Sequence, residues 1–331
     1  MLTFLSLSRE LMYHYITTLY SLGARENVVH LWRNYIPQQA FENRFLMHGL
    51  LALAALHLAH LRPDNSSRYL RSCDKHQDIA LQEFRSILAA PVDPELANAL
   101  VALAATLSVS SMARSCAPLE NKTMELGDIT ELFILTKGIR NMIHLAYEHV
   151  WQGPLAAMLE SQQPYPEDTQ VYLPLHVSSR FEAIRRILFT CGLDQEALDD
   201  CLFALSELKK IYKNIVHISA TASVEMGDVS RWQVIVSMGY VKLIEARKPP
   251  ALVILAYYAA AVTAVRTAWY AQGWAEYALR AISQALDDKM QHWVEWPMQQ
   301  VQEKMSALGV RSPSVQLFDE RTYSRGPSTS L

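Results

Sequence analysis

The sequence lacks the closely spaced cysteines on which many small metal sites and disulfide frameworks depend. Its 331 residues include only four cysteines, Cys73, Cys116, Cys191 and Cys201, and no two of them form a C-x-x-C pair. A structural zinc site needs thiolates or imidazoles at short, regular spacings. We therefore predict no metal site, and we expect the cysteines to be buried, reduced thiols of an intracellular protein.

Charge is also scarce. Charged residues make up 19% of the chain, the formal net charge is −3, and no run of lysine and arginine occurs. A protein that neutralises nucleic-acid phosphates needs a surplus of these cations. Direct nucleic-acid binding by this chain is therefore not expected, and the pairs Arg185-Arg186 and Lys209-Lys210 are typical of solvated helix faces.

No apolar run reaches the roughly 20 residues that a membrane-spanning helix needs. The longest runs are 45–61, which contains three histidines, and 251–265, which is followed by Arg266. Residues 1–7 are apolar but lack the basic start and the cleavage site of a signal peptide. We expect no membrane span and no signal peptide, and we interpret the two long runs as buried helices.

The common catalytic motifs are missing as well. The chain contains no G-x-S-x-G, no Walker loop, no G-x-G-x-x-G after a strand and no H-E-x-x-H. We therefore assign no catalytic residues and no cofactor, and we do not expect a standard enzyme mechanism.

His57 and His60 are three residues apart, so they share a helix face as two metal ligands could. No third ligand lies at a recognisable spacing. A structural role is favoured, in which these rings form hydrogen bonds with the backbone or with neighbours such as His76 or Asp78.

What the sequence has in abundance is apolar side chain at helical spacing. Half of the residues are hydrophobic, and they recur every three or four positions almost throughout, which predicts an all-α fold. We expect a single large multi-helix domain over residues 1–310, followed by a polar, disordered tail over 311–331. Helices are predicted at 8–22, 41–61, 66–88, 93–112, 129–151, 178–190, 194–214, 229–246, 251–270 and 274–292, with a last helix to about residue 308.

Several stretches, in this order along the chain, resemble one family. The resemblance is to the C-terminal regulatory domain of fungal Zn2Cys6 transcription factors of the sterol uptake control type, and it spans roughly residues 11–296. The stretches are Leu11-Met12-Tyr13-His14-Tyr15, Ala40-Phe41, the His-rich run from Phe45 to Pro63, His76-Gln77, Ala80-Leu81, Lys137-Gly138-Ile139-Arg140, Gln152-Gly153-Pro154-Leu155, the run from Pro250 to Tyr258, and Gly273-Trp274-Ala275.

The resemblance implies an all-helical, often dimeric domain that, in the sterol sensors, holds a lipid in an apolar pocket and so controls nuclear entry and activation. The family reads DNA through a separate N-terminal cluster of six cysteines that binds two zinc ions. This sequence has no such cluster. If the sequence is complete, we expect that it cannot read DNA by the route of the family.

The two apolar helices, 45–61 and 251–270, are expected to lie side by side and to line a ligand pocket, because lipid sites are mostly apolar with few polar anchors. Ordinary core packing is the alternative. Gly273 and Trp274 form either a hinged flap over the pocket or a helix-ending glycine beside a packed ring. The candidate ligand-binding residues are Phe45, Met47, His48, Leu51, His57, Leu252, Leu255, Tyr258, Gly273 and Trp274.

These features lead to two hypotheses of different classes, beside the weaker one of a degenerate gene product. The first is a ligand-sensing module of a transcription regulator. It would bind a hydrophobic, sterol- or terpenoid-like molecule in the nucleus or cytoplasm, and would act as a homodimer or with a full-length regulator. The second is a repurposed enzyme of secondary metabolism, a cyclase or isomerase that needs no cofactor and folds a hydrophobic intermediate by shape and desolvation.

Overall fold

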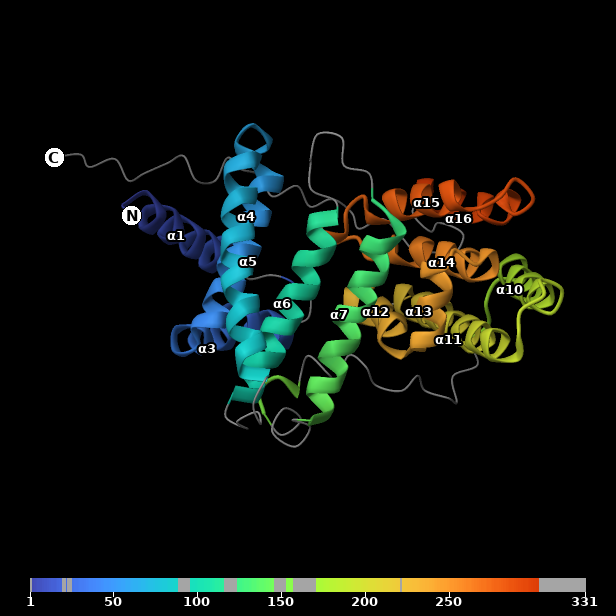
Figure 1. Ribbon diagram of the computed structural model, residues 1–331, viewed down its shortest axis with the longest axis horizontal. Coiled ribbons are helices and arrows are strands. Elements are labelled where there is room, and N and C mark those ends of the chain that lie inside the picture. The colour runs from blue at the N-terminus through green and yellow to red at the C-terminus, as the bar shows by residue number, and fades with distance from the viewer. Residues whose placement is uncertain are drawn as a thin grey trace.

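The computed structural model describes residues 2–19, 22, 26–88, 96–115, 124–145, 153–156, 171–220 and 222–303 of the chain. Within these ranges all regular secondary structure is helical and no strand occurs, which confirms the all-α prediction. The predicted tail, 311–331, lies outside the described residues. Figure 1 shows a first group of helices, α1 to α5, on one side, α6 and α7 in the middle, and α10 to α16 on the other side.

The first half of the molecule is built from six α-helices and three short helical segments. The α-helices are α1 (Leu2–His14), α2 (Glu26–His30), α3 (Ile36–Glu42), α4 (Arg44–Leu61), α5 (Ser66–Leu88) and α6 (Ala97–Ser115). The short segments are the π-helices η1 (Tyr15–Leu19) and η2 (Leu31–Tyr35) and the 3₁₀-helix η3 (Pro63–Asn65). We call this group the N-terminal half.

The remaining described helices form the C-terminal half. The α-helices are α7 (Leu126–Leu145), α10 (Leu175–Leu188), α11 (Gln195–Ser219), α12 (Met226–Ile235), α13 (Met238–Glu245), α14 (Pro249–Val262), α15 (Trp274–Ala285) and α16 (Glu295–Gln302). Two 3₁₀-helices, η6 (Trp269–Ala271) and η7 (Gln291–Trp293), lie before α15 and before α16.

Several helix ends follow directly from local sequence chemistry. The carboxylate of Asp194 accepts a hydrogen bond from the Ala197 amide at 2.8 Å and caps α11. Ser237 caps α13 in the same way, through the Tyr240 amide. Pro249 and Pro250 occupy the first turn of α14, where a missing amide hydrogen costs nothing.

Several predicted helices are divided in the structure. The predicted helix 251–270 ends as α14 at Val262, before the 3₁₀-helix η6, and 274–292 ends as α15 at Ala285, before η7. The predicted helix 41–61 is interrupted at Asn43, which has an extended backbone (φ −120°, ψ 102°) and whose side-chain amide donates to the Gln39 carbonyl at the end of α3. The predicted helix 229–246 is interrupted between α12 and α13, where Val236 leaves the helical region. Pro37, expected to break the chain, instead lies buried in the first turn of α3.

Helix α4 is the centre of the N-terminal half. It packs against α1, α3, α5 and α6, and only its ends and part of one face approach solvent. Gly49 permits the close approach of α6, because a β-carbon at this position would lie 2.5 Å from Leu103 Cδ1. The fold therefore requires a very small residue at this crossing.

One helix in the described part of the chain, α4, is long and apolar enough by length and composition to cross a membrane. Most of it, 72% of the apolar window, is buried inside the fold. Because a core helix passes the same test, the burial of α4 among its neighbours accounts for its composition.

Helix α14 is the centre of the C-terminal half. Every residue from Pro250 to Val262 is buried, because α10, α11, α13, α15 and α16 surround the helix. Three buried polar side chains are satisfied around this core: Tyr212 donates to the Tyr257 carbonyl, Tyr240 to the Ala251 carbonyl, and the Trp232 indole to the Ala204 carbonyl. The composition of α14 is thus explained by burial on all sides.

The two apolar helices are both buried, as predicted, but the expectation that they lie side by side is wrong. Helices α4 and α14 belong to different halves, and the main contacts between the halves are those of α6 with α7 and with η6. Helix α7 in turn packs on α12, α13 and α15 of its own half. Figure 1 shows α6 and α7 between the two groups. Any ligand site shared by the two halves must therefore lie at their junction.

Candidate functional site at the junction of the two halves

The end of α4 reaches the C-terminal half through a contact between histidine and tryptophan rings. Trp269, in η6, lies against His57 with the ring centroids 4.5 Å apart and the planes at 34°. His60, one turn further along α4, lies 5.9 Å from the same indole. Together with His14, described next, these residues form what we call the His–Trp cluster: His14, His57, His60 and Trp269.

His57 is also linked to α1. Its Nδ1 atom lies 3.0 Å from Nε2 of His14, the last residue of α1, so the two imidazoles share a hydrogen bond. Burial, followed by the nearby His14 and His60, lowers the pKa of His57 to about 4. Burial, with a smaller effect of Arg62, also lowers the pKa of His14. At neutral pH this pair is uncharged.

The indole nitrogen of Trp269 has an unused donor. Trp269 Nε1 is buried, and no hydrogen-bond partner for it occurs among the described residues. A buried donor without a partner typically costs about 1–3 kcal/mol. An acceptor brought within hydrogen-bond distance of this nitrogen would remove that cost.

A second pair of histidines lies near the other end of α4. Nδ1 of His48 is 2.7 Å from Nδ1 of His76 on α5. Burial, followed by the nearby His48 and Lys75, lowers the pKa of His76 to about 4. The pKa of His48 is lowered by burial, then by Arg44. The hydrogen bond expected of His57 is present, but with a different partner: His57 pairs with His14, and His76 pairs with His48.

The candidate residues of α4 fall into two groups that cannot share one small site. Phe45, Met47, His48 and Leu51 lie in the first half of the helix, whereas His57 lies near its end. Twelve residues separate Phe45 from His57, which corresponds to about 18 Å along the helix axis. Only His57 is brought to the junction with the C-terminal half.

The candidate residues of α14 and α15 lie in a packed aromatic core. Tyr258 stacks on Trp232 at 4.5 Å and meets Phe133 and Trp274 edge to face. Its hydroxyl accepts a hydrogen bond from the Gln233 amide at 2.5 Å. Leu252, Leu255 and Trp274 are as deeply buried as Tyr258. These side chains are buried together in the C-terminal half.

Gly273 precedes α15 with φ at +81°, in the left-handed region that favours glycine. Trp274, the next residue, is 1% exposed. The pair therefore forms a helix start beside a packed ring, and Trp269, four residues earlier, is the residue that meets α4. The sequence analysis did not single out His14 or Trp269, although His14 lies within the first of the resembling stretches.

The described residues offer no site for a metal ion: no group of three or more His, Cys, Asp and Glu side chains converges there. Cys73, Cys191 and Cys201 are free, and Cys116 lies outside the described ranges. Burial raises the pKa of the Cys73 and Cys201 thiols to about 12, so both are unreactive.

Comparison with known proteins agrees with an all-helical regulatory domain. Residues 11–120 match the family described as the fungal specific transcription factor domain. Over this stretch the chain is thus similar to a regulatory domain of fungal transcription factors.

More particular relatives are of two kinds. A Zn(2)-C6 fungal-type transcription factor of Gibberella zeae is 22% identical over 353 aligned positions, which cover 95% of this chain and 70% of the relative. Sterol uptake control protein 2 of Saccharomyces cerevisiae is 33% identical over 108 residues, and that of Candida albicans is 32% identical over 114 residues. These two matches cover about a third of this chain but only 11% and 15% of the relatives.

Proposed function

We propose that this chain is the ligand-sensing module of a transcription regulator and that it binds a hydrophobic, sterol- or terpenoid-like molecule at the His–Trp cluster. Residues 1–310 would act as one unit, in the nucleus or cytoplasm, paired with a second copy or with a full-length regulator. Support for a single unit comes from the buried side chains between Leu11 and Val301, which form one continuous apolar cluster.

The observation that carries the proposal is the indole N–H of Trp269, which has no hydrogen-bond partner within the described part of the chain and lies beside the neutral ring of His57. Both lie where two apolar halves meet. Ligand sites for apolar molecules combine a largely apolar surface with a few polar groups that fix orientation. A rigid apolar molecule with one hydroxyl group fits this pattern, because its oxygen can accept from Nε1 while its rings contact the flanking aromatic side chains.

The class of ligand is suggested by the relatives. Two of them carry the name sterol uptake control protein. A sterol is a rigid, polycyclic hydrocarbon with a single hydroxyl group, which is the chemistry favoured at Trp269. Binding there would change the contact between α4 and η6. It would therefore also change the relative arrangement of the two halves, which a partner protein contacts.

The test is a titration of the full chain with dehydroergosterol, a fluorescent sterol, followed by energy transfer from tryptophan. We expect saturable binding to the wild-type chain. Trp269→Phe keeps an apolar ring but removes the N–H donor, so it should weaken binding about tenfold, which corresponds to one hydrogen bond of about 1.4 kcal/mol.

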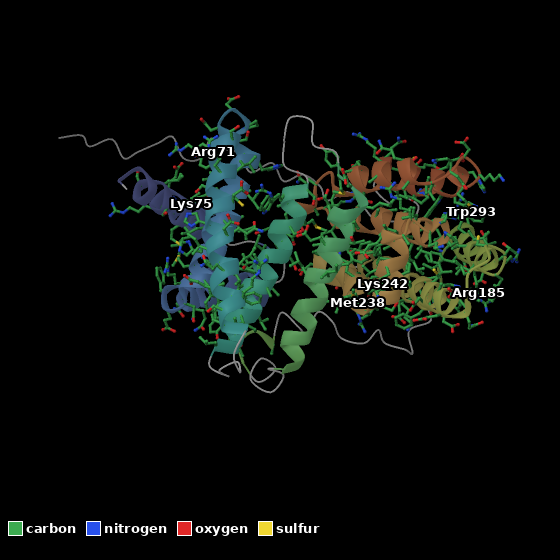
Figure 2. The ribbon with its side chains drawn as sticks, viewed as in Figure 1. Arg71, Lys75, Arg185, Met238, Lys242 and Trp293 are labelled. Atoms are coloured by element: carbon green, nitrogen blue, oxygen red, sulfur yellow. The ribbon has the colours of Figure 1, made fainter. Side chains whose placement is uncertain are left out.

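Trp293→Phe is the matched control, because Trp293 is a partly buried tryptophan near α10, at the far end of the C-terminal half (Figure 2). This variant should bind the sterol with unchanged affinity. Binding that is lost equally in both variants, or that never saturates in the wild-type chain, would contradict a site at the His–Trp cluster.

A further inference from the structure

Helix α4 is joined to two other helices by the same unusual bond. At one end His57 shares a hydrogen bond with His14 of α1, with 3.0 Å between the nitrogens. Near the other end His48 shares one with His76 of α5, at 2.7 Å. The paired rings lie 5.0 Å apart, centroid to centroid, in both cases. Thus two side-chain bonds of the same kind hold α1 and α5 against the central helix of the N-terminal half.

Such a pair tolerates one added proton but not two. A neutral imidazole has one N–H donor and one acceptor nitrogen, so two neutral rings, or one neutral and one protonated ring, can share a hydrogen bond. When both rings are protonated, both nitrogens are donors and two positive charges face each other at about 3 Å. The bond between the helices is then replaced by repulsion.

The charged groups around the pairs offer little compensation. Glu10 and Arg62 face His14 with opposite signs, and they also form an ion pair with each other at 3.0 Å. Glu83 and Arg44 face His48 and form an ion pair at 3.2 Å. On α5, Tyr69 and Arg68 contact Glu10, at 2.8 and 3.9 Å, Lys75 lies beside His76, and Cys73 lies near Asp74, near Asp78 and near Arg114 of α6. Further titratable groups on the elements packed around α4 include Tyr15 on η1, Glu42 on α3, Asp64 on η3, and His60 on α4 itself.

We propose that these two pairs form a proton-operated clamp on α4: double protonation of a pair releases α1 or α5 from it. The direction follows from the folded-state pKa values of His57 and His76, about 4, below the ordinary value of 6.5. Because the pKa is lower in the folded state, the contribution of each histidine pair to the free energy of unfolding is complete above pH 6.5. That contribution is lost as the pH falls from 6.5 toward 4. Acid therefore loosens the N-terminal half first, whether or not a ligand binds at the junction.

Hydrogen exchange followed by mass spectrometry on the full chain tests the clamp. Exchange is measured at about pH 7.5 and about pH 4.5 and corrected for the intrinsic rate, with peptides from α14 as the internal reference. In the wild-type chain, protection of α1 and α5 should fall at least about tenfold relative to α14, since one pKa unit corresponds to a factor of ten.

Two double variants separate the pairs: His14→Gln with His57→Gln, and His48→Gln with His76→Gln. Glutamine keeps a donor and an acceptor but does not titrate near these pH values. The first variant should lose the acid response of α1, and the second that of α5. His30→Gln is the control, because His30 lies exposed at the end of α2 and belongs to neither pair, and it should respond as the wild-type chain does.

The proposal is overturned if α1 and α5 in the wild-type chain show no loss of protection relative to α14. It is also overturned if the double variants respond to acid as strongly as the wild-type chain. The wild-type measurement decides the first point even if a double variant does not fold.

Discussion

Replacing Gly49 with alanine should destabilise the protein, against the usual effect of this change inside a helix. The added methyl group would lie 2.5 Å from Leu103 Cδ1, whereas carbon atoms in contact are normally about 3.5–4.0 Å apart. Leu103 is completely buried, so its side chain has no solvent to move into. Either Leu103 leaves its preferred rotamer or α4 and α6 move apart.

The size of the effect comes from two opposing terms. Overpacking of a core typically costs about 1–3 kcal/mol, while replacing glycine by alanine within a helix contributes up to about 1 kcal/mol. Gly138 supplies the matched control, because it lies exposed in α7 with no atom within 4 Å of the added β-carbon. We therefore expect Gly138→Ala to raise the free energy of unfolding by about 0.5–1 kcal/mol. The change in the free energy of unfolding caused by Gly49→Ala should be about 1–3 kcal/mol less favourable than the change caused by Gly138→Ala.

Urea unfolding followed by circular dichroism measures both variants. Leu103→Ala removes the atom that the new methyl group meets, so the cost of Gly49→Ala should shrink or disappear in that background. If Gly49→Ala stabilises the chain as much as Gly138→Ala does, the close crossing of α4 and α6 is not as described here.

Three further substitutions test other contacts by the same measurement. Gly273→Ala should lower the free energy of unfolding by about 1–2 kcal/mol, because φ is +81° there; an unchanged value would argue against the left-handed start of α15. Tyr258→Phe leaves the buried Gln233 amide without its acceptor and should cost about 1–3 kcal/mol; no loss would mean that the amide finds another partner. Gly239→Ala places a β-carbon against the carboxylate of Asp200, so a cost of about 1 kcal/mol or more is expected. That cost should vanish in an Asp200→Ala background.

The helices with clear end signals were predictable from the sequence. The predicted helix 66–88 coincides with α5, and α11 begins directly after Asp194, the residue that caps it. A short polar side chain before an amphipathic run is a local signal, because the capping bond reaches only two or three residues along the chain. Such a signal does not depend on how the rest of the chain packs.

The interruptions at Asn43 and Val236 were missed because apolar residues continue at helical spacing on both sides of each, and that pattern alone predicts one helix. At Val236 a local signal was present, since the next residue, Ser237, caps α13 through the Tyr240 amide. Asn43 is also a residue type favoured before a helix, but its side chain forms no cap to α4 and donates to the Gln39 carbonyl instead. Tertiary packing overrode the apolar pattern at both positions.

The candidate site was only partly predictable for the same reason. An apolar composition indicates that α4 and α14 are buried, but it does not indicate what buries them, and each proved to be the centre of a different half. His57 could be singled out because a histidine is unusual in so apolar a run. Its partner His14 lies 43 residues earlier in the chain, and its partner Trp269 lies in the segment after α14. No rule of sequence spacing links such distant positions.

The central claim is that a hydrophobic molecule binds where the two halves meet. The most direct measurement is mass spectrometry of the lipids extracted from the full chain after purification from a sterol-producing yeast. We expect a sterol- or terpenoid-like molecule at about one per chain, and a clear reduction in its amount in Trp269→Phe but not in Trp293→Phe. A folded wild-type chain that yields no such molecule, and takes none up when sterol is added, would contradict it.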